Sequence, residues 1–221
     1  EWKRQPTSEG PVQARLVIVA SGARLRQLGV PGEAELAGRG VSQCDWCDGG
    51  FFRGEPVMVV GGGDAAFQAA LHLAQLCASV TVVMRSANMR ARRAYVQAAA
   101  ENERITFLWD TTVERINGTD KVESVTLRDH AEGTVADHPT AGVFVFAGVE
   151  AQAGFLPEEV ARDAAQCLVT DADFRTSMPG VFAIGAVRSG YRGQLVSACG
   201  EGAAVAAVVS QALEALQEAQ A

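Results

Sequence analysis

The stretch "EPVMVVGGGDAAFQAALHLA" (residues 55–74) joins an apolar run, a triple-glycine turn and an alanine-rich segment. A continuous apolar run is typical of a parallel strand covered on both faces. Residues 64–78, after the glycines, have apolar side chains at helical spacing. The stretch "SVTVVMR" (79–85) predicts a second strand, and residues 90–103 predict a second helix with a basic start. Strand, helix and strand within about 30 residues form a βαβ unit. We therefore predict an α/β fold built on a parallel sheet.

The glycine turn has the spacing of a dinucleotide-binding loop, Gly61-x-Gly63-x-x-Ala66. The first glycine permits the sharp turn, the second lets the backbone approach a pyrophosphate, and Ala66 lets the helix pack closely on the strand. The first helical N–H groups, including those of Asp64 and Ala65, would then face the phosphates. A tight turn without a ligand is the alternative. Because the motif follows a strand and opens a helix, we predict nucleotide binding.

The end of the second strand indicates which nicotinamide cofactor binds. An NAD enzyme usually carries Asp or Glu there, about 20 residues after the glycines. This chain has "VVMRSANMRARR" (82–93), with Arg85 at the strand end, Arg90 after it, and no acid. Guanidinium groups suit a 2′-phosphate, although a solvated basic helix start is the alternative. The pattern favours NADPH.

A cysteine pair, Cys44 and Cys47, stands just before this unit in "CDWCDGG" (44–50). Cys-x-x-Cys thiols have lowered pKa values and exchange readily with disulfides. Asp48 is a candidate general acid/base for the thiol proton. A zinc half-site would lack its second pair of ligands, and a structural disulfide would close a very short loop. We favour a redox pair and expect no metal.

Composition limits the remaining classes. The formal net charge is −7 and the pI is about 5.0, which argues against nucleic acid and anionic lipid as partners. No apolar run reaches the roughly 18 residues of a membrane span, and no signal peptide is visible. Five cysteines, an odd number, do not suit a secreted disulfide scaffold. We expect a cytoplasmic protein with no membrane partner.

Several motifs in this order resemble the low-molecular-weight, bacterial-type thioredoxin reductases, class II of the pyridine nucleotide-disulfide oxidoreductases. In that family a Cys-x-x-Cys-Asp-Gly motif opens the NADPH domain shortly before GxGxxA, as in residues 38–74 here. Further similar stretches are "RLVIVASGARLRQLGVPGE" (15–33), "MRSANMRA" (84–91), "PGVFAIGA" (179–186) and "GQLVSACGEGAAVA" (193–206).

The resemblance implies two Rossmann-like, three-layer ββα domains, with the NADPH domain inserted into the FAD domain. The NADPH domain would span 41–150, between FAD-domain parts at 1–40 and 151–221. The family's first FAD-binding βαβ unit, with its own GxGxxG, is expected before residue 14 and is not in this sequence.

The resemblance also implies a reaction. NADPH reduces FAD, FAD reduces the disulfide, and the dithiol reduces thioredoxin or a similar small redox protein. Cys47 would face the flavin, Cys44 would attack the external disulfide, and the enzyme would be a homodimer. The matching FAD-binding positions are Ser21, Gly22, Gly185, Gln194 and Leu195.

Some positions depart from the family's pattern. Ala186 stands where a carboxylate is expected to bind the flavin ribityl chain, Met84 and Ser86 replace a histidine and an arginine of the NADPH motif, and Asp45-Trp46 replaces a small pair. Two other functions therefore stay open. One is a flavoprotein acting on a small-molecule disulfide or dithiol, and the other is a non-catalytic nucleotide-binding protein.

Overall fold

The computed structural model describes residues 3–5, 10, 12–87, 89–191 and 193–219. The chain forms two compact units. Residues 25–148 make the inserted unit, and residues 1–24 together with 149–221 make the outer unit. The boundaries expected from the sequence were 40/41 and 150/151. Which unit holds which cofactor stays a prediction.

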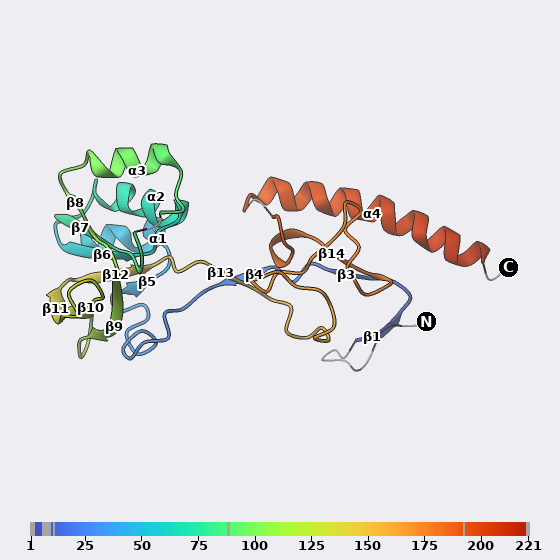
Figure 1. Cartoon of the computed structure of the whole chain (residues 1–221), viewed down its shortest axis with the longest axis horizontal. Helices are drawn as coiled ribbons and strands as arrows, with labels where there is room; N and C mark the ends of the chain where they lie inside the picture. Colours follow the sequence, from blue (N-terminus) through green and yellow to red (C-terminus); the bar gives the residue numbers. More distant parts are fainter. Residues whose placement is uncertain (1–2, 6–9, 11, 88, 192, 220–221) are drawn as a thin grey trace. The chain divides into compact units, whose positions relative to one another are not determined.

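A five-stranded parallel sheet forms the centre of the inserted unit (Figure 1). Its strand order is β5-β12-β6-β7-β8, and all four neighbouring pairs are parallel. The strands are β5 (Val41–Ser42), β6 (Pro56–Val60), β7 (Ser79–Val83), β8 (Ile105–Leu108) and β12 (Gly142–Val145). The predicted α/β class is confirmed.

Strand β6 shows why its sequence is apolar throughout. Val57 and Val59 lie in the core beneath α2 (Asp64–Leu73) and α3 (Arg93–Ala100). Met58 and Val60 lie in a second core on the opposite face. Side chains alternate between the faces of a strand, so a sheet covered on both faces needs apolar residues at every position.

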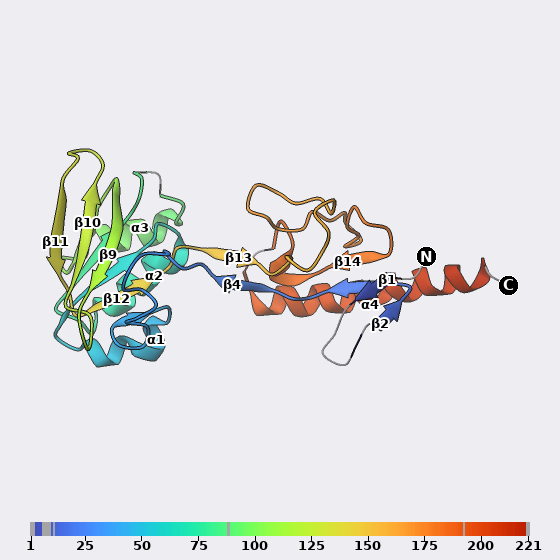
Figure 2. The ribbon, with the colours of Figure 1, turned by 90° about the horizontal axis from the view of Figure 1, so that it is seen from below.

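The second face is covered by an antiparallel sheet in the order β11-β10-β9. Figure 2 shows these three strands side by side. They are β9 (Thr111–Asn117), β10 (Ser124–Asp129) and β11 (Val135–Pro139). Helices, parallel sheet and antiparallel sheet therefore make the three-layer ββα arrangement that the resemblance implied.

Two helices are shorter than the sequence indicated. The alanine-rich segment was expected to be helical over 64–78, but α2 ends at Leu73. Beyond Leu73 the chain forms tighter turns. The N–H of Gln75 donates to the carbonyl oxygen of His72, and the N–H of Leu76 donates to the carbonyl oxygen of Leu73. Bonds of this i→i−3 type commonly close a helix end. The helix expected over 90–103 is α3, which begins at Arg93 and ends at Ala100.

The outer unit contains a small parallel pair, β3 with β14, over a core that includes Val19, Leu168 and Val187. Strand β1 pairs with β2, and β4 with β13. The elements are β1 (Lys3–Gln5), β2 (Val12–Ala14), β3 (Val17–Val19), β4 (Ala23–Leu25), β13 (Val149–Ala151), β14 (Val181–Ala183), the 3-10 turn η2 (Gly185–Val187) and α4 (Leu195–Glu218).

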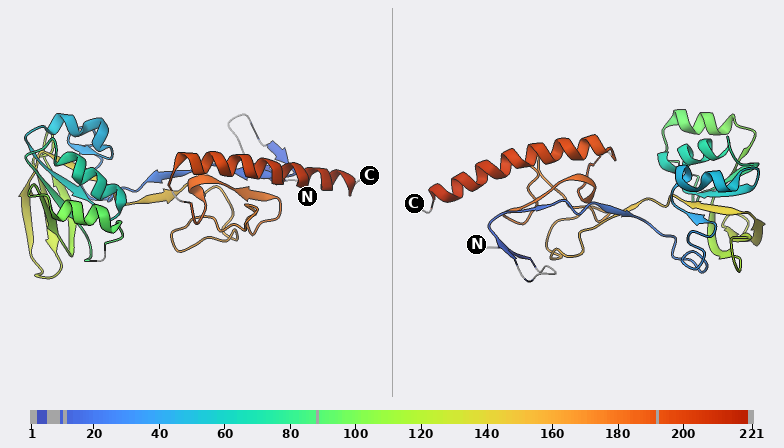
Figure 3. Two further views of the ribbon diagram at one scale, coloured as in Figure 1. Left: turned by 90° about the horizontal axis from the view of Figure 1, so that it is seen from above. Right: turned by 180° about the vertical axis from the view of Figure 1, so that it is seen from behind.

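Helix α4 is one continuous helix of 24 residues (Figure 3), and Val205 is its buried residue among those described. By length and composition it could cross a membrane, with a mean hydropathy of 1.4. This differs from the sequence-based expectation that no apolar run reaches the length of a membrane span, although Glu201 and Glu214 lie within the helix. One helix of this kind is weak evidence for a membrane span.

Candidate functional site

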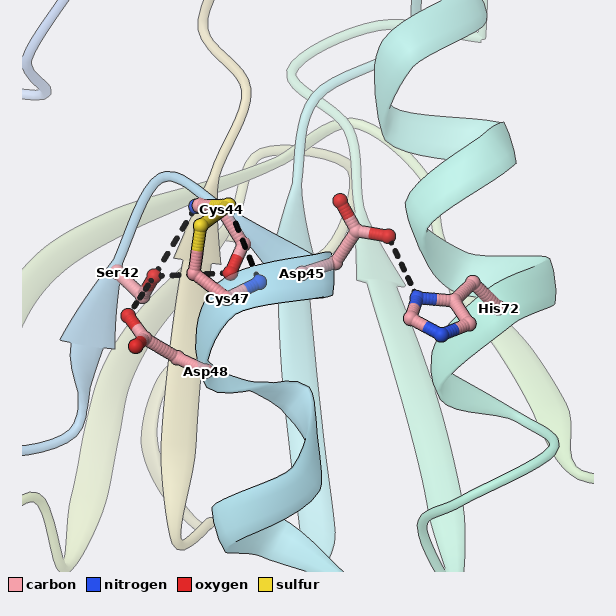
Figure 4. Close-up of a disulfide and its surroundings, with 6 residues drawn as sticks. All are labelled: Ser42, Cys44, Asp45, Cys47, Asp48 and His72. Carbon is pink, nitrogen blue, oxygen red and sulfur yellow. Dashed lines mark hydrogen bonds and ion pairs between the residues drawn. A yellow bond between two sulfur atoms is a disulfide. The ribbon is translucent and has the colours of Figure 1, made fainter.

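The cysteine pair forms a disulfide at the start of α1 (Asp45–Asp48), which is followed by the 3-10 turn η1 (Gly49–Phe52) (Figure 4). Cys44 is the N-cap residue with extended backbone, and the Cys47 N–H points at Cys44 Sγ over 3.1 Å. One helical turn therefore sets the spacing of the motif. The two Cα atoms lie 5.3 Å apart, inside the range that a disulfide needs.

The two cysteines differ in exposure. Cys47 is exposed, whereas Cys44 is half-buried at the N-cap. The roles implied by the resemblance, with Cys44 as the attacking thiol and Cys47 facing the flavin, stay predictions. An N–H aimed at Cys44 Sγ would favour a thiolate on that sulfur after reduction, because hydrogen bonds to a charged form stabilise it.

Asp48 is held beside the pair by a residue that the sequence analysis did not select. Ser42, in β5, donates its hydroxyl to Asp48 Oδ2 over 2.6 Å and accepts the Cys44 N–H over 3.0 Å. The carboxylate therefore lies on the same side of α1 as the N-cap cysteine (Figure 4). The only hint in the sequence is the short distance along the chain from a serine to the motif.

The two residues between the cysteines both contact His72 on α2. His72 Nδ1 lies 2.8 Å from Asp45 Oδ2. The Trp46 and His72 rings stack with centroids 3.8 Å apart and planes at 17°. No role for His72 was predicted from the sequence, so this contact was missed. Within the described residues no group of three or more His, Cys, Asp or Glu side chains could hold a metal ion.

The glycine turn opens onto a cavity of about 450 Å³ in the inserted unit. Gly61 has φ +146°, and a Cβ there would lie 2.4 Å from the Phe146 carbonyl oxygen. Gly63 is the N-cap of α2, and a Cβ on it would meet nothing within 4 Å. The first glycine is thus needed for the turn itself, whereas the second leaves open space in front of the helix.

The start of α2 fits a phosphate group. No side chain in the described part of the chain caps this helix end, so its first N–H groups are free to bind an anion. Ala66, in the first turn of α2, is fully buried in the core that holds Val57 and Val59, as close packing on the strand requires, and Ala65 is exposed. Asp64 binds Arg92 twice: Oδ1 accepts the Arg92 backbone N–H over 2.7 Å, and Oδ2 lies 3.0 Å from the guanidinium Nε. Arg92 thereby offsets a carboxylate that would repel phosphate.

Both arginines predicted to bind the 2′-phosphate line the same cavity as the glycine turn. The N–H of Arg90 donates to the Gly62 oxygen over 3.0 Å, which holds the arginine segment against the turn. Arg26 also lines the cavity, although it lies 35 positions before Gly61 in sequence and was not predicted. The donor set fits a dinucleotide with an additional phosphate.

The predicted FAD-binding positions lie in the outer unit. The Ser21 hydroxyl donates to the Gln152 oxygen over 2.5 Å, and the Gly185 N–H donates to Glu201 Oε2 over 2.6 Å. Gly22 has φ +71°. Gln194 is the N-cap of α4, and Leu195, its first residue, is 81% exposed.

The start of α4 suits an anionic group in the same way as α2, since no described side chain caps it. Ala186 supplies no carboxylate beside it. Glu201 on α4 accepts the Gly185 N–H and is ion-paired with Arg188 at 3.2 Å. Residues of the outer unit that would hold FAD are therefore Gly22, Gly185 and the first turn of α4.

The other described cysteines lie outside the redox pair. Burial raises the pKa of the Cys77 thiol, and burial together with the Asp163 carboxylate raises the pKa of the Cys167 thiol. A raised pKa leaves less thiolate at neutral pH, so these thiols are poor nucleophiles. Cys77 and Cys167 are therefore not expected to compete with the pair at α1, whereas the third free cysteine, Cys199 on α4, is exposed.

A dinucleotide turn and a cysteine pair in one α/β unit define a nucleotide-dependent thiol–disulfide oxidoreductase. Residues 3–219 match the pyridine nucleotide-disulphide oxidoreductase family. A thioredoxin reductase of Treponema pallidum is 40% identical, covering 96% of this chain and 68% of that protein. A thioredoxin reductase of Bacillus subtilis is 37% identical, covering 99% of this chain and 69% of that protein.

Solved structures agree. Lactococcus lactis thioredoxin reductase in the FR conformation matches with a TM-score of 0.84 and 36% identity, over 95% of this chain and 70% of that one. The thioredoxin reductase of T. acidophilum matches with a TM-score of 0.79 and 34% identity, over 92% of this chain and 67% of that one. The chain belongs to the pyridine nucleotide-disulphide oxidoreductase family. It is therefore an oxidoreductase of a family that uses FAD and NADPH.

Proposed function

We propose that this protein uses NADPH and FAD to reduce thioredoxin, or a small protein like it, through the Cys44–Cys47 pair. The observation that carries the proposal is the placement of the disulfide within the unit that holds the glycine turn and its arginine-lined cavity. Curated relatives of 36–40% identity named thioredoxin reductase support it.

NADPH binding falls to the inserted unit. The first N–H groups of α2 hold the pyrophosphate, and Gly63 leaves the space for it. Arg85 and Arg90 bind the 2′-phosphate. Bound FAD supplies two-electron transfer between the nicotinamide and the disulfide. With two protons, those electrons break the S–S bond and leave two thiols.

The cysteine pair then passes the electrons on. The Cys44 thiolate attacks one sulfur of the partner's disulfide, and the other partner sulfur leaves with the bond's electron pair. Cys47 next attacks Cys44 Sγ, which restores the disulfide and releases the second partner thiol. Asp48 moves the proton at the cysteine sulfurs, and Ser42 holds the carboxylate in place.

Two further properties belong to the proposal. We infer a homodimeric enzyme that works in the cytoplasm, where thiols are kept reduced. Sedimentation equilibrium of the FAD-loaded protein tests the first point, with twice the chain mass as the expected result. A monomer at micromolar concentration would contradict it.

The test of the reaction is to trap the partner. In the whole FAD-loaded protein, Cys47→Ser should stop after the first attack and accumulate a mixed disulfide with thioredoxin. Cys44→Ser should form none. Cys167→Ser, which removes a half-buried thiol outside the pair, is the matched control and should turn over normally.

Two results would contradict the proposal. Trapping through Cys44→Ser instead would reverse the roles of the two cysteines. Equal turnover with thioredoxin and with a small disulfide such as oxidised glutathione would instead favour the small-molecule reaction.

A further inference from the structure

We propose that His72 is a positioning residue for the redox pair, which makes the Cys44–Cys47 dithiol a stronger reductant by holding both intervening residues against α2. The contacts lie in what we call the His72 cluster, made of Asp45, Trp46 and His72. The inference rests on the proposed function only in that the pair cycles between disulfide and dithiol.

The hydrogen bond between His72 and Asp45 is sheltered from solvent. The side chains of His72 and Asp45 are only 15% and 13% exposed, and Nδ1 lies 2.8 Å from Oδ2. Figure 4 shows Asp45 pointing toward His72. Asp48 lies on the other side of α1, next to Ser42 of β5. Because the two sides of the short helix have different partners, the His72 contact is not a duplicate of the Ser42 contact.

The stacking contact adds a second restraint on the same turn. The Trp46 ring lies on the His72 ring at a centroid distance of 3.8 Å, although the residue as a whole is 79% exposed. An exposed tryptophan that still stacks in parallel has one face covered and one open. His72 therefore restrains both residues that separate the cysteines.

This restraint matters because α1 is only four residues long. A single helical turn is not stable in isolation, since nucleating a helix is unfavourable. In the oxidised protein the disulfide itself closes the turn. After reduction that covalent link is gone, and the turn then depends on its contacts with β5 and α2.

The consequence for the redox equilibrium follows from linkage. A contact that keeps the two cysteines at the disulfide distance lowers the conformational entropy of the dithiol, whose cysteines would otherwise be free to move apart. The disulfide already holds them at that distance, so the contact costs the oxidised pair no further entropy. The contact therefore favours the oxidised pair and lowers its reduction potential. Removing His72 should make the dithiol easier to form and less reducing.

The experiment measures that equilibrium directly. FAD-loaded protein without NADPH is equilibrated with mixtures of reduced and oxidised dithiothreitol, in which one dithiol is oxidised for each Cys44–Cys47 disulfide reduced. Free cysteines are then alkylated and counted by mass spectrometry. We expect His72→Ala to shift the equilibrium constant toward the protein dithiol by about threefold to tenfold, the size of the net contribution of one typical hydrogen bond.

Three variants separate positioning from general damage. His72→Asn keeps a donor near the position of Nδ1 and should therefore show a smaller shift than His72→Ala. Asp45→Asn should show the same shift as His72→Ala. His130→Ala is the matched control, because His130 hydrogen-bonds Thr112 at 2.9 Å in the same unit but is not part of α1 or its contacts. That control should leave the equilibrium constant unchanged.

Each outcome decides the inference. A shift confined to His72 and Asp45 variants supports it, and a non-additive double variant locates the effect in their contact. An unchanged constant, a shift toward the disulfide, or an equal shift in His130→Ala would overturn it. If His72→Ala unfolds, Asp45→Asn tests the same contact by the same criterion. Since neither NADPH nor thioredoxin takes part, failure of the proposed function would be seen separately.

Discussion

The hydroxyl of Ser42 donates a 2.6 Å hydrogen bond to Asp48 Oδ2, and the same oxygen accepts the N–H of Cys44 over 3.0 Å. One side chain at the end of β5 thus connects the N-cap and the last residue of α1. It orients the candidate acid/base and fixes the backbone of the half-buried cysteine together.

Removing that hydroxyl should slow thiol–disulfide exchange. Ser42→Ala is expected to lower kcat with thioredoxin by about threefold to tenfold, because one hydrogen bond of typical strength is lost. Asp48→Asn should cost more, on the order of 10²-fold or greater, as for a lost general acid/base. Stopped-flow reoxidation of the dithiol measures both. If Ser42→Ala exchanged as fast as the wild type, Ser42 would have no role in placing Asp48.

The two glycines of the nucleotide turn should respond differently to alanine. Gly61→Ala should destabilise the protein by about 1–3 kcal/mol, because its Cβ would collide with the Phe146 oxygen at 2.4 Å. Gly63→Ala should fold normally, since its Cβ meets nothing within 4 Å, but should weaken NADPH binding by filling the approach to the phosphates. Denaturant unfolding and NADPH titration measure the two effects. Equal stability losses would contradict this division.

Arginine removal should change the choice between nicotinamide cofactors. Replacing Arg85 or Arg90 by Ala is expected to raise KM for NADPH by about 10- to 100-fold, the value of one or two charged hydrogen bonds, and to leave KM for NADH unchanged. Arg115→Ala, an exposed arginine on β9 that does not line the cavity, is the control. An equal loss with both cofactors would show that these arginines do not read the 2′-phosphate.

Cys77 should resist alkylation in the folded protein. Burial raises the pKa of its thiol, so the thiolate fraction at any given pH is smaller, and the side chain is only 1% exposed. After reduction, Cys47 should react with iodoacetamide at pH 8 at least about tenfold faster than Cys77. Peptide mass mapping over time checks this. Comparable rates would mean that the α2 core opens readily.

The local features of this fold are predictable from the sequence. β6 is apolar at every position because both faces are covered, and the glycine turn occurs where a strand meets a helix. The cysteine pair is equally visible, because its chemistry is carried by four consecutive residues.

The contacts that arrange the site are not local. His72 meets Asp45 across 27 positions, and Arg26 lines the same cavity as the glycine turn although it lies far from it in sequence. Neither residue belongs to a spacing pattern, and a single histidine is as common in a core as in a site. The length of α2 was also overestimated, since an Ala/Leu-rich sequence continues through the i→i−3 turns that follow Leu73.

The central claim is that electrons from NADPH reach the Cys44–Cys47 disulfide. The most direct measurement is to add one equivalent of NADPH anaerobically to the whole FAD-loaded protein and to count alkylated cysteines by mass spectrometry. We expect Cys44 and Cys47 to gain two thiols together while the flavin returns to its oxidised spectrum. NADPH that bleaches the flavin but leaves the disulfide intact would contradict the account.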